Sequence, residues 1–283
     1  MEKAIKKYWI IFILPTMAAF LIGFVWPFIW GIYLSLNKFQ TLKKVEFVGF
    51  SNYIKVFQDE TFLHAFWFTA LFTLVSTIVI NVLAFAVAML LTRKIRGTNV
   101  FRTVFFMPNL IGGIVLGYIW QSLLNGLLYI WDKPLLALSA TEGFWGLVIL
   151  MGWQQIGYMM IIYIAGLQNV SPDLIEAAQI DGASAWDVLK HVKIPMVMPS
   201  ITICTFLTLT NSFKLFDQNL SLTGGEPAKN TQMLALNIYD TYYARSGAQW
   251  KGIGQAKAVV FFVIVVAISL IQLKFTRSKE VQA

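Results

Sequence analysis

Long uncharged stretches of apolar residues alternate with short polar segments along most of this chain. A helix that crosses a bilayer needs about 20 mostly apolar residues. Six runs without Asp, Glu, Lys or Arg approach or exceed that length. They are Tyr8–Asn37, Thr61–Thr92, Thr103–Trp131, Gly143–Pro172, Ile194–Phe213 and Ala258–Leu273. The last run is short, but Lys257 and Lys274 at its ends can extend their ammonium groups to the membrane surfaces.

This pattern predicts an all-α membrane protein with a single transmembrane domain over residues 1–283. The first run is longer than the apolar region of a signal peptide and has no small-residue cleavage site, so we expect it to be a retained span. A polar loop at 168–195, with helical character, separates the fourth and fifth spans. The spans are placed at about 9–36, 65–91, 104–124, 144–167, 196–213 and 256–274.

The distribution of Lys and Arg predicts the orientation of the spans, because cytoplasmic loops are enriched in both. The short 93–102 loop contains Arg93, Lys94, Arg96 and Arg102 and no acidic residue. With this loop inside, the Lys3, Lys6 and Lys7 segment and the Lys274–Lys279 segment are also inside. Both termini are therefore expected in the cytoplasm.

Composition supports a membrane protein and excludes several other classes. Hydrophobic residues make up 58% of the chain and charged residues 13%, whereas soluble domains carry about 25% charged residues. The net charge of +8 is spread over loops without a dense basic stripe, so no nucleic-acid partner is expected. The single cysteine, Cys204, lies in an apolar run and is interpreted as a packing residue.

The 168–195 loop has the sequence signals of a helix-turn-helix. Ser171 can cap a helix whose first position is Pro172. Gly182 can end that helix because glycine adopts positive φ without strain. Ser184–Asp187 has the pattern of a capping box and opens a second helix. Two short helices joined at a glycine turn are therefore predicted on the inner membrane surface.

This loop could rest on lipid or dock another protein. A helix lying on lipid favours Lys and Arg on its polar face. The first loop helix carries Asp173, Glu176 and Asp181 and no basic residue, and the small Ala177 and Ala178 permit close approach. The pattern favours docking of a protein.

The same loop carries a specific motif, and further motifs flank it. The loop motif consists of Glu176-Ala177-Ala178, Asp181-Gly182-Ala183, Ile194-Pro195 and Pro199. The others are Val48–Tyr53, Arg96-Gly97, Phe101–Thr103, Phe106–Pro108, Ser212–Asp217 and Leu222–Gly225. Together they resemble the "EAA" permeases of binding-protein-dependent ABC importers, in the carbohydrate branch that includes MalF, LacF, MsmF and UgpA. Two departures are Leu189, where the family usually has Phe, and Glu226, where it usually has Gly.

The resemblance implies a type I ABC importer permease (MetI-like) fold in the bacterial plasma membrane. It implies a second homologous permease subunit, two ABC ATPase subunits, an extracytoplasmic sugar-binding protein and surrounding lipid as partners. This chain would bind no cofactor, since ATP and Mg²⁺ belong to the ATPase subunits. The residues implied in coupling to the ATPase are Glu176, Ala177, Ala178, Asp181, Gly182, Ala183 and Pro195.

The outer loops Asn37–Glu60 and Gly224–Lys251 are expected to receive the binding protein. They are long, and the second contains aromatic residues of the kind enriched at protein interfaces. These are Tyr239, Tyr242, Tyr243 and Trp250.

Amide side chains at similar depths in three spans suggest a substrate path. At about 1.5 Å per residue, Asn81, Gln155 and Asn211 all lie near the middle of the bilayer. Amides supply donors and acceptors for sugar hydroxyls, although each amide could instead bridge two helices. With the family's sugar-binding segments, the candidate path comprises Asn81, Trp153, Gln154, Gln155, Tyr158, Asn211, Phe213, Lys214 and Asp217. Gly113 and Gly117 are interpreted only as a close helix-packing motif.

Other functions remain as alternatives with weaker support. A glycerol-phosphate permease would need a basic residue in the cavity, and Lys214 leaves that possibility open. An ion-coupled carrier would need acidic residues within its spans, and the six runs contain none. A membrane enzyme or an ATP-binding chain is disfavoured, because no GxxxxGK[ST], HExxH or GxSxG motif occurs. The two histidines, His64 and His191, form no metal-ligand cluster.

Overall fold

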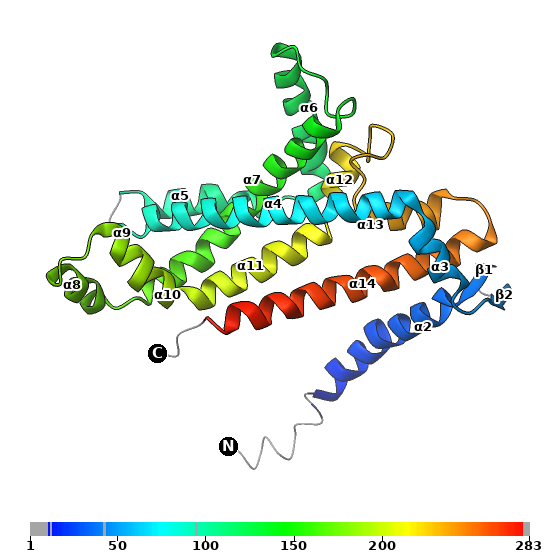
Figure 1. The fold of residues 1–283 in the computed structure, drawn as a ribbon, viewed down its shortest axis with the longest axis horizontal. Coiled ribbons are helices and arrows are strands. Elements are labelled where there is room, and N and C mark those ends of the chain that lie inside the picture. Colours follow the sequence, from blue (N-terminus) through cyan, green and yellow to red (C-terminus); the bar gives the residue numbers. More distant parts are fainter. Residues whose placement is uncertain (1–10, 12, 42–43, 94–95, 280–283) are drawn as a thin grey trace. The chain divides into compact units, whose positions relative to one another are not determined.

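A computed structural model of the chain describes residues 11, 13–41, 44–93 and 96–279. The first residues of the predicted 9–36 span lie outside this part, as do Lys3, Lys6, Lys7, Lys43 and Lys94. The helices, which are labelled in Figure 1, group into two compact units. The first unit contains the described residues up to Glu60 together with Ile238–Val263, and the second contains Thr61–Asn237 and the described residues from Ile264 onward.

The first unit joins helical segments to a small antiparallel hairpin that the all-helical prediction did not include. The Asn52 side chain fixes the start of the hairpin, because its amide nitrogen donates to the carbonyls of Ser35 (2.8 Å) and Asn37 (2.9 Å). Phe39 is the hairpin's buried apolar residue. The elements are a π-helical turn (Leu21–Val25), α2 (Trp26–Ser35), β1 (Asn37–Thr41), β2 (Lys44–Phe47), α3 (Ser51–Gln58), a second π-helical turn (Asp240–Ala244) and the first part of α14 (Ala248–Arg277).

α7 lies at the centre of the second unit. Of an apolar stretch of 18 residues in this helix, 61% are buried, whereas the corresponding share in α4 is 28%. α7 contacts α5, α6, α11 and α12, and its buried glycines permit these close approaches. The helices are α4 (Glu60–Leu91), α5 (Thr98–Phe106), α6 (Gly113–Ile130), α7 (Ala140–Gln168), α8 (Pro172–Ile180), α9 (Ala185–Val188), α10 (Ile194–Met196), α11 (Met198–Phe213), α12 (Asp217–Leu222) and α13 (Leu234–Tyr239).

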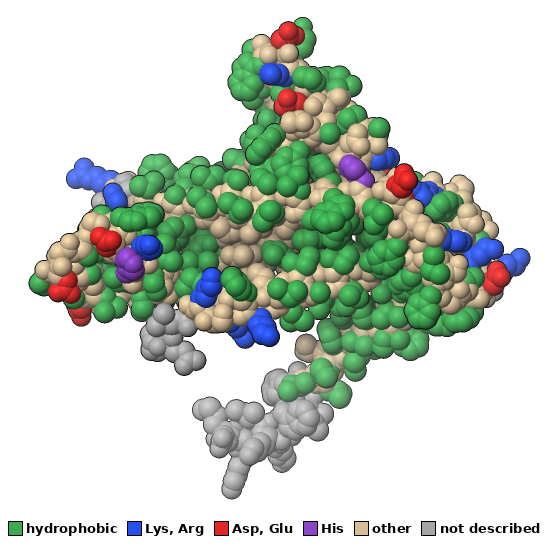
Figure 2. Space-filling view, viewed as in Figure 1, with side chains coloured by type: hydrophobic (Ala, Val, Ile, Leu, Met, Phe, Trp, Pro, Cys, Tyr) green, Lys and Arg blue, Asp and Glu red, His purple; other side chains and the backbone are tan. Residues whose placement is uncertain are grey.

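Five helices in the described part are long and apolar enough to cross a membrane. A sixth is formed if the helical segment Ala185–Met196 and α11, which are bent by 71° at Val197, count as one span. Figure 2 shows hydrophobic side chains over most of the visible face of the long helices, with charged side chains mainly near helix ends and loops. The five unbent spans are Ile13–Ser35, Glu60–Leu91, Gly113–Ile130, Ala140–Gln168 and Ala248–Arg277.

The prediction of a continuous third span at 104–124 is wrong. α5 ends at Phe106, a 3₁₀ turn covers Met107–Leu110, and α6 begins only at Gly113. Pro108 lacks a backbone N–H, and Ile111 and Gly112 have extended backbones with ψ of 133° and 137°. The apolar run therefore divides into two helices, and the longer one continues to Ile130.

The Gly113 and Gly117 motif packs closely against α12, as the sequence predicted. A Cβ atom on Gly113 would lie 2.8 Å from Cβ of Asp217, and one on Gly117 would clash with Oγ of Ser221. Only glycine permits α12 to lie this close to α6. This contact places Asp217 and Gln218 where they help line a cavity.

The Lys257 side chain is buried inside the protein, whereas the sequence predicted that its ammonium group extends to a membrane surface. Its side chain is fully buried, and its ammonium group lies 2.8 Å from the Asp59 carboxylate. An ammonium group can remain in a protein interior when it is paired with a carboxylate. α14 runs from Ala248 to Arg277, beyond both ends of the predicted span at 256–274.

Candidate functional site

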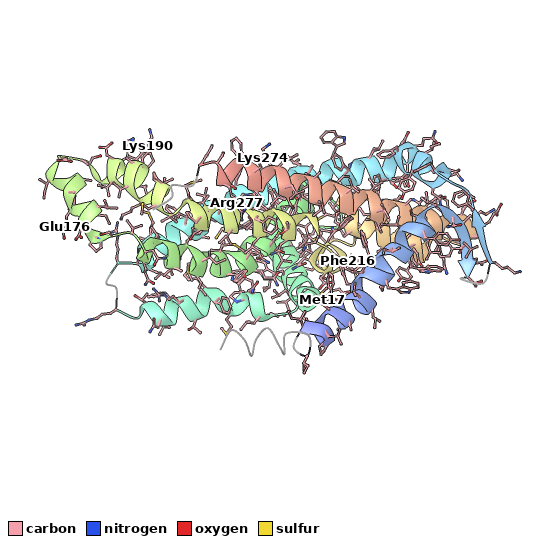
Figure 3. The ribbon with its side chains drawn as sticks, turned by 90° about the horizontal axis from the view of Figure 1, so that it is seen from below. Met17, Glu176, Lys190, Phe216, Lys274 and Arg277 are labelled. Carbon is pink, nitrogen blue, oxygen red and sulfur yellow. The ribbon has the colours of Figure 1, made fainter. Side chains whose placement is uncertain are left out.

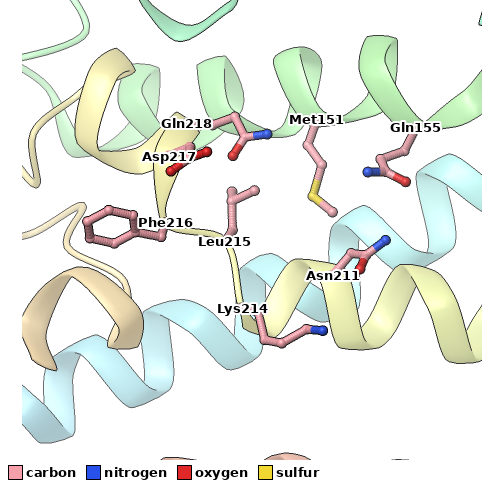
Figure 4. Close-up of a pocket in the computed structure, with 8 residues that line it drawn as sticks. All are labelled: Met151, Gln155, Asn211, Lys214, Leu215, Phe216, Asp217 and Gln218. Atoms are coloured by element: carbon pink, nitrogen blue, oxygen red, sulfur yellow. The ribbon is translucent and has the colours of Figure 1, made fainter. Parts of the chain in front are cut away.

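A cavity of about 330 Å³ lies within the second unit, between α7, α11 and the start of α12. Figure 4 shows the Gln155 side chain extending from α7 and Asn211 facing it from α11. Small-molecule sites in proteins have volumes of about 300 Å³ and more. The lining residues are Met151, Gln155, Asn211, Lys214, Leu215, Phe216, Asp217 and Gln218.

The helices position these side chains by simple periodicity. Met151 and Gln155 are four residues apart on α7, so they lie on the same face one turn apart. Asn211 lies in the last turn of α11, which ends at Phe213. The chain then leaves the helix, and α12 begins at Asp217. The break between α11 and α12 thus supplies one side of the cavity.

The cavity combines polar groups of both charge signs with apolar surface. Oε1 of Gln155 is buried and has no hydrogen-bond partner within the described residues. Such an orphaned acceptor in a cavity can accept a hydrogen bond from a bound hydroxyl group. Lys214 contributes a cation and Asp217 an anion, and Met151, Leu215 and Phe216 supply apolar surface.

Hydrogen bonds of Gln218 and Gln154 stabilise the wall of the cavity. Gln218 donates to Oε1 of Gln154 (2.6 Å), and Gln154 donates to the carbonyl of Ile111 (3.1 Å). Both side chains are almost completely buried. Gln154 therefore joins α7 to the break before α6 and does not line the cavity.

The structure brings together four of the predicted path residues: Gln155, Asn211, Lys214 and Asp217. Three aromatic candidates do not line this cavity. The Trp153 ring lies 5.4 Å from that of Trp120, the Tyr158 ring lies 6.4 Å from that of Phe106, and Phe213 is buried.

Asn81 bridges helices instead of lining the cavity. Its amide nitrogen donates to Oγ1 of Thr208 (2.8 Å), and its amide oxygen accepts from the Tyr163 hydroxyl (2.6 Å). These bonds join α4 to α11 and to α7. The bridging alternative is favoured for this residue, because its donor and acceptor are both engaged within the protein.

The cavity also contains Met151, Leu215, Phe216 and Gln218, which the sequence did not single out as path residues, although Leu215 and Phe216 lie within the Ser212–Asp217 motif. Helical spacing from Gln155 could have identified Met151 one turn earlier. The other three belong to the segment that follows α11, whose path depends on the close packing of α12 against α6. No local signal fixes that path.

The 168–195 loop forms the predicted pair of helices. Ser171 accepts from the Asp173 amide and Pro172 begins α8. Gly182 has φ of +83°. Ser184 and Asp187 form the predicted capping box. Hydrogen bonds from the Ser184 hydroxyl, and to a smaller extent from the Ser184 amide, lower the pKa of Asp187, because they stabilise the carboxylate form.

The implied coupling residues lie largely at the surface of this loop. Glu176, Ala177, Asp181 and Gly182 are exposed, and Ala178, Ala183 and Pro195 are half-buried. Figure 3 shows Glu176 and Lys190 at the same end of the second unit.

Two large apolar side chains add to this surface. Ile180 is 85% exposed and Trp186 is 67% exposed. The buried residue of α9 is Val188, so Trp186 is left at the surface. The exposed loop surface is therefore apolar as well as acidic.

The described residues contain no group of three or more His, Cys, Asp and Glu side chains that could hold a metal ion. Cys204 is buried and unpaired, and its thiol lies 3.7 Å from the Met159 carbonyl. This contact fits the packing role predicted for it.

Comparison with known proteins places these features in context. Residues 80–280 match the profile described as "Binding-protein-dependent transport system inner membrane component". The chain is 44% identical to the "Probable starch degradation products transport system permease protein AmyD" of Thermoanaerobacterium thermosulfurigenes, covering 97% of this chain and 95% of that protein. It is 29% identical to "Multiple sugar-binding transport system permease protein MsmF" of Streptococcus mutans, covering 99% of each.

The fold is also similar to that of a solved structure. A chain from the crystal structure of a bacterial ABC transporter involved in the import of the acidic polysaccharide alginate aligns with a TM-score of 0.81. The alignment covers 98% of both chains at 21% identity. At this identity the similarity is evidence for the fold.

Proposed function

The chain belongs to the family of inner membrane components of binding-protein-dependent transport systems, and we propose that it forms part of the transmembrane path of an ATP-driven oligosaccharide importer. The names of the relatives AmyD and MsmF support a sugar as the cargo. A permease subunit positions and releases its cargo without chemically changing it. The function therefore depends on a reversible binding site and on a connection to an energy source.

The observation that carries the proposal is the cavity between Gln155 and Asn211. Sugar hydroxyls need both donors and acceptors, and amides supply both from one side chain. The apolar side chains of Met151, Leu215 and Phe216 suit the C–H faces of a sugar ring. A neutral oligosaccharide therefore fits the mixed lining better than a purely apolar molecule.

Glycerol phosphate is the alternative cargo, and Lys214 is the feature that favours it. A phosphate group would gain from the Lys214 ammonium group but would be repelled by the Asp217 carboxylate in the same cavity. A neutral sugar can hydrogen-bond to both groups without repulsion. The presence of both a cation and an anion in the cavity therefore supports a sugar cargo over a phosphate ester.

ATP hydrolysis is proposed to occur on two separate ATPase subunits, which bind the nucleotide and Mg²⁺. The exposed 168–195 loop supports this arrangement, because it presents Glu176 and Asp181 beside Ile180 and Trp186. A surface with charges beside large apolar side chains suits a protein partner better than bulk water. This loop would transmit closure of the ATPase subunits to α7 and α11, which flank it in the sequence.

We place the 168–195 loop and both chain ends on the cytoplasmic side. A second homologous permease would complete the path, and the outer loops 37–60 and 224–251 would receive the sugar-binding protein. The basic 93–102 loop supports this orientation.

The test is uptake into proteoliposomes that contain the complete complex. We expect ATP-dependent uptake of a labelled malto-oligosaccharide when its binding protein is added outside. We expect no uptake by the purified chain alone, and none by the complex without ATP. Uptake of sn-glycerol 3-phosphate in preference to the sugar would favour the alternative cargo. Sugar uptake by the chain alone would overturn the proposal.

A further inference from the structure

A buried ion pair joins three segments of the first unit that are far apart in the sequence. Nζ of Lys257 on α14 lies 2.8 Å from Oδ2 of Asp59, which directly follows α3. The same ammonium group donates to Oγ1 of Thr241 (2.8 Å), within the π-helical turn Asp240–Ala244. Arg245 lies 3.6 Å from the same oxygen of Asp59. These contacts fix the turn and the end of α3 to one point on α14.

Burial distinguishes this ion pair from those on the surface. The Lys257 side chain is 0% exposed and that of Asp59 is 15% exposed. Lys38 and Glu46 form an ion pair at 3.7 Å in the same unit, with side chains 45% and 71% exposed. Exposed pairs contribute little to stability, whereas breaking a buried pair leaves an uncompensated charge. The Asp59–Lys257 pair therefore fixes local geometry in a way that Lys38–Glu46 cannot.

The segment fixed by this pair presents aromatic side chains at the surface. We call residues 239–250 the outer aromatic segment. The rings of Tyr239 and Tyr243 lie 4.9 Å apart, and both side chains are exposed. The Arg245 guanidinium group lies 4.5 Å from the centroid of the Trp250 ring.

The outer aromatic segment is attached to the rest of the unit at several points. Thr241 is held by Lys257, and Arg245 is held by Asp59. A Cβ atom on Gly254 would lie 3.0 Å from Cβ of Tyr242, so the segment packs directly on α14 within one turn of Lys257. The ion pair therefore sets the orientation of the exposed tyrosines.

We propose that Asp59 and Lys257 are positioning residues, and that their ion pair holds the outer aromatic segment in the orientation contacted by the external binding protein. The docking role of this segment rests on the proposed function. The pairing also implies that replacing Asp59 and replacing Lys257 have unequal effects. Loss of Asp59 leaves the fully buried Lys257 ammonium group without this carboxylate. Loss of Lys257 leaves Asp59 beside Arg245 and partly accessible to water.

The test compares Asp59→Asn, Lys257→Met and the double variant in the assembled complex. The matched control is Lys133→Met, which removes the charge of an exposed lysine outside the two outer loops that are proposed to receive the binding protein. The measured quantity is the concentration of sugar-loaded binding protein that gives half-maximal stimulation of ATP hydrolysis. Hydrolysis without the binding protein and the yield of assembled complex are recorded beside it.

We expect Asp59→Asn to raise this concentration by about tenfold, which corresponds to roughly 1.4 kcal/mol. Lys257→Met and the double variant should raise it by about threefold, because neither leaves a buried charge unpaired. The control should match the wild type. Hydrolysis without the binding protein should be unchanged, whereas a role confined to folding would lower the yield without shifting the half-maximal concentration.

An unchanged half-maximal concentration in the variants that assemble would overturn the positioning role. If Asp59→Asn fails to assemble, Lys257→Met and the double variant decide the question. A wild-type complex that does not respond to the loaded binding protein would instead contradict the proposed function, and the docking role with it.

Discussion

Gln155 and Asn211 reach the same cavity from different helices, and we expect each to hold a sugar hydroxyl. Replacing either with Leu keeps the bulk and removes the hydrogen bonds. One hydrogen bond contributes about 0.5–1.5 kcal/mol, so uptake of the malto-oligosaccharide should fall by roughly threefold to tenfold at a limiting sugar concentration. Complex assembly and stimulation by the binding protein should be retained. Unchanged uptake in both variants would assign these amides to helix bridging.

Asn81 should behave differently, because its amide bonds to Thr208 and Tyr163 within the protein. Asn81→Leu removes both contacts, and such bonds in membrane proteins contribute about 0.6–1.7 kcal/mol. We expect a lower thermal unfolding temperature of the purified complex, with Tyr163→Phe giving a smaller decrease. A variant with normal thermal stability and impaired uptake would return Asn81 to the substrate path.

At the scale of the element, the turn between α8 and α9 depends on the positive φ of Gly182. No heavy atom lies within 4 Å of a Cβ placed there, so a side chain would meet backbone strain and no steric clash. Gly182→Val should strain the turn by roughly 1–3 kcal/mol and misalign the two loop helices. The spans should still insert, and the partner permease should still bind. We expect loss of the ATPase subunits in pull-down, or loss of hydrolysis stimulated by the binding protein.

Gly182→Asn is the matched control, because asparagine tolerates positive φ better than a β-branched residue. It should retain most of the ATPase binding and of the stimulated hydrolysis. Wild-type behaviour of Gly182→Val in both measurements would mean that this loop does not couple the permease to the ATPase.

The capping box at the start of α9 predicts that the local stability of this helix depends on pH. Hydrogen bonds from Ser184 lower the pKa of Asp187 in the folded loop. Their stabilising contribution is present above the ordinary carboxyl pKa and is lost as the pH falls through the lowered value. Amide hydrogen-exchange protection at 185–189 should therefore decrease at acidic pH. Asp187→Asn should abolish this dependence, and an identical pH profile in that variant would rule out the capping carboxylate as its source.

At the scale of the whole molecule, the proposed orientation can be tested by labelling. The natural Cys204 is fully buried, so it should not react with a membrane-impermeant maleimide in the folded protein. Lys229→Cys should be labelled from outside intact cells, and Lys190→Cys only after permeabilisation. The reverse result would invert the topology and place the 168–195 loop outside.

The sequence predicts the helices well because a chain in lipid must satisfy its backbone groups within each span. It could not predict that Lys257 is buried, because the compensating carboxylate, Asp59, lies in a distant segment. The cavity was predicted in part, through the depths of Gln155 and Asn211. Trp153 and Phe213 do not line the cavity, because positions two apart on a helix point in nearly opposite directions. Nearness in sequence does not give two side chains a shared face.

The 71° bend at Val197 makes the segment Ala185–Met196 a lever arm. At 1.5 Å per residue the arm is about 18 Å long, and Gly182 lies just beyond its free end. A displacement of about 3 Å at that end, perpendicular to the arm, would rotate the arm by about 10° if Val197 is the fulcrum and the arm keeps this length. The same rotation applied to α11 would shift Asn211, near its far end, by a comparable distance. A movement of the loop end would therefore reach the cavity at about the same size, neither amplified nor reduced.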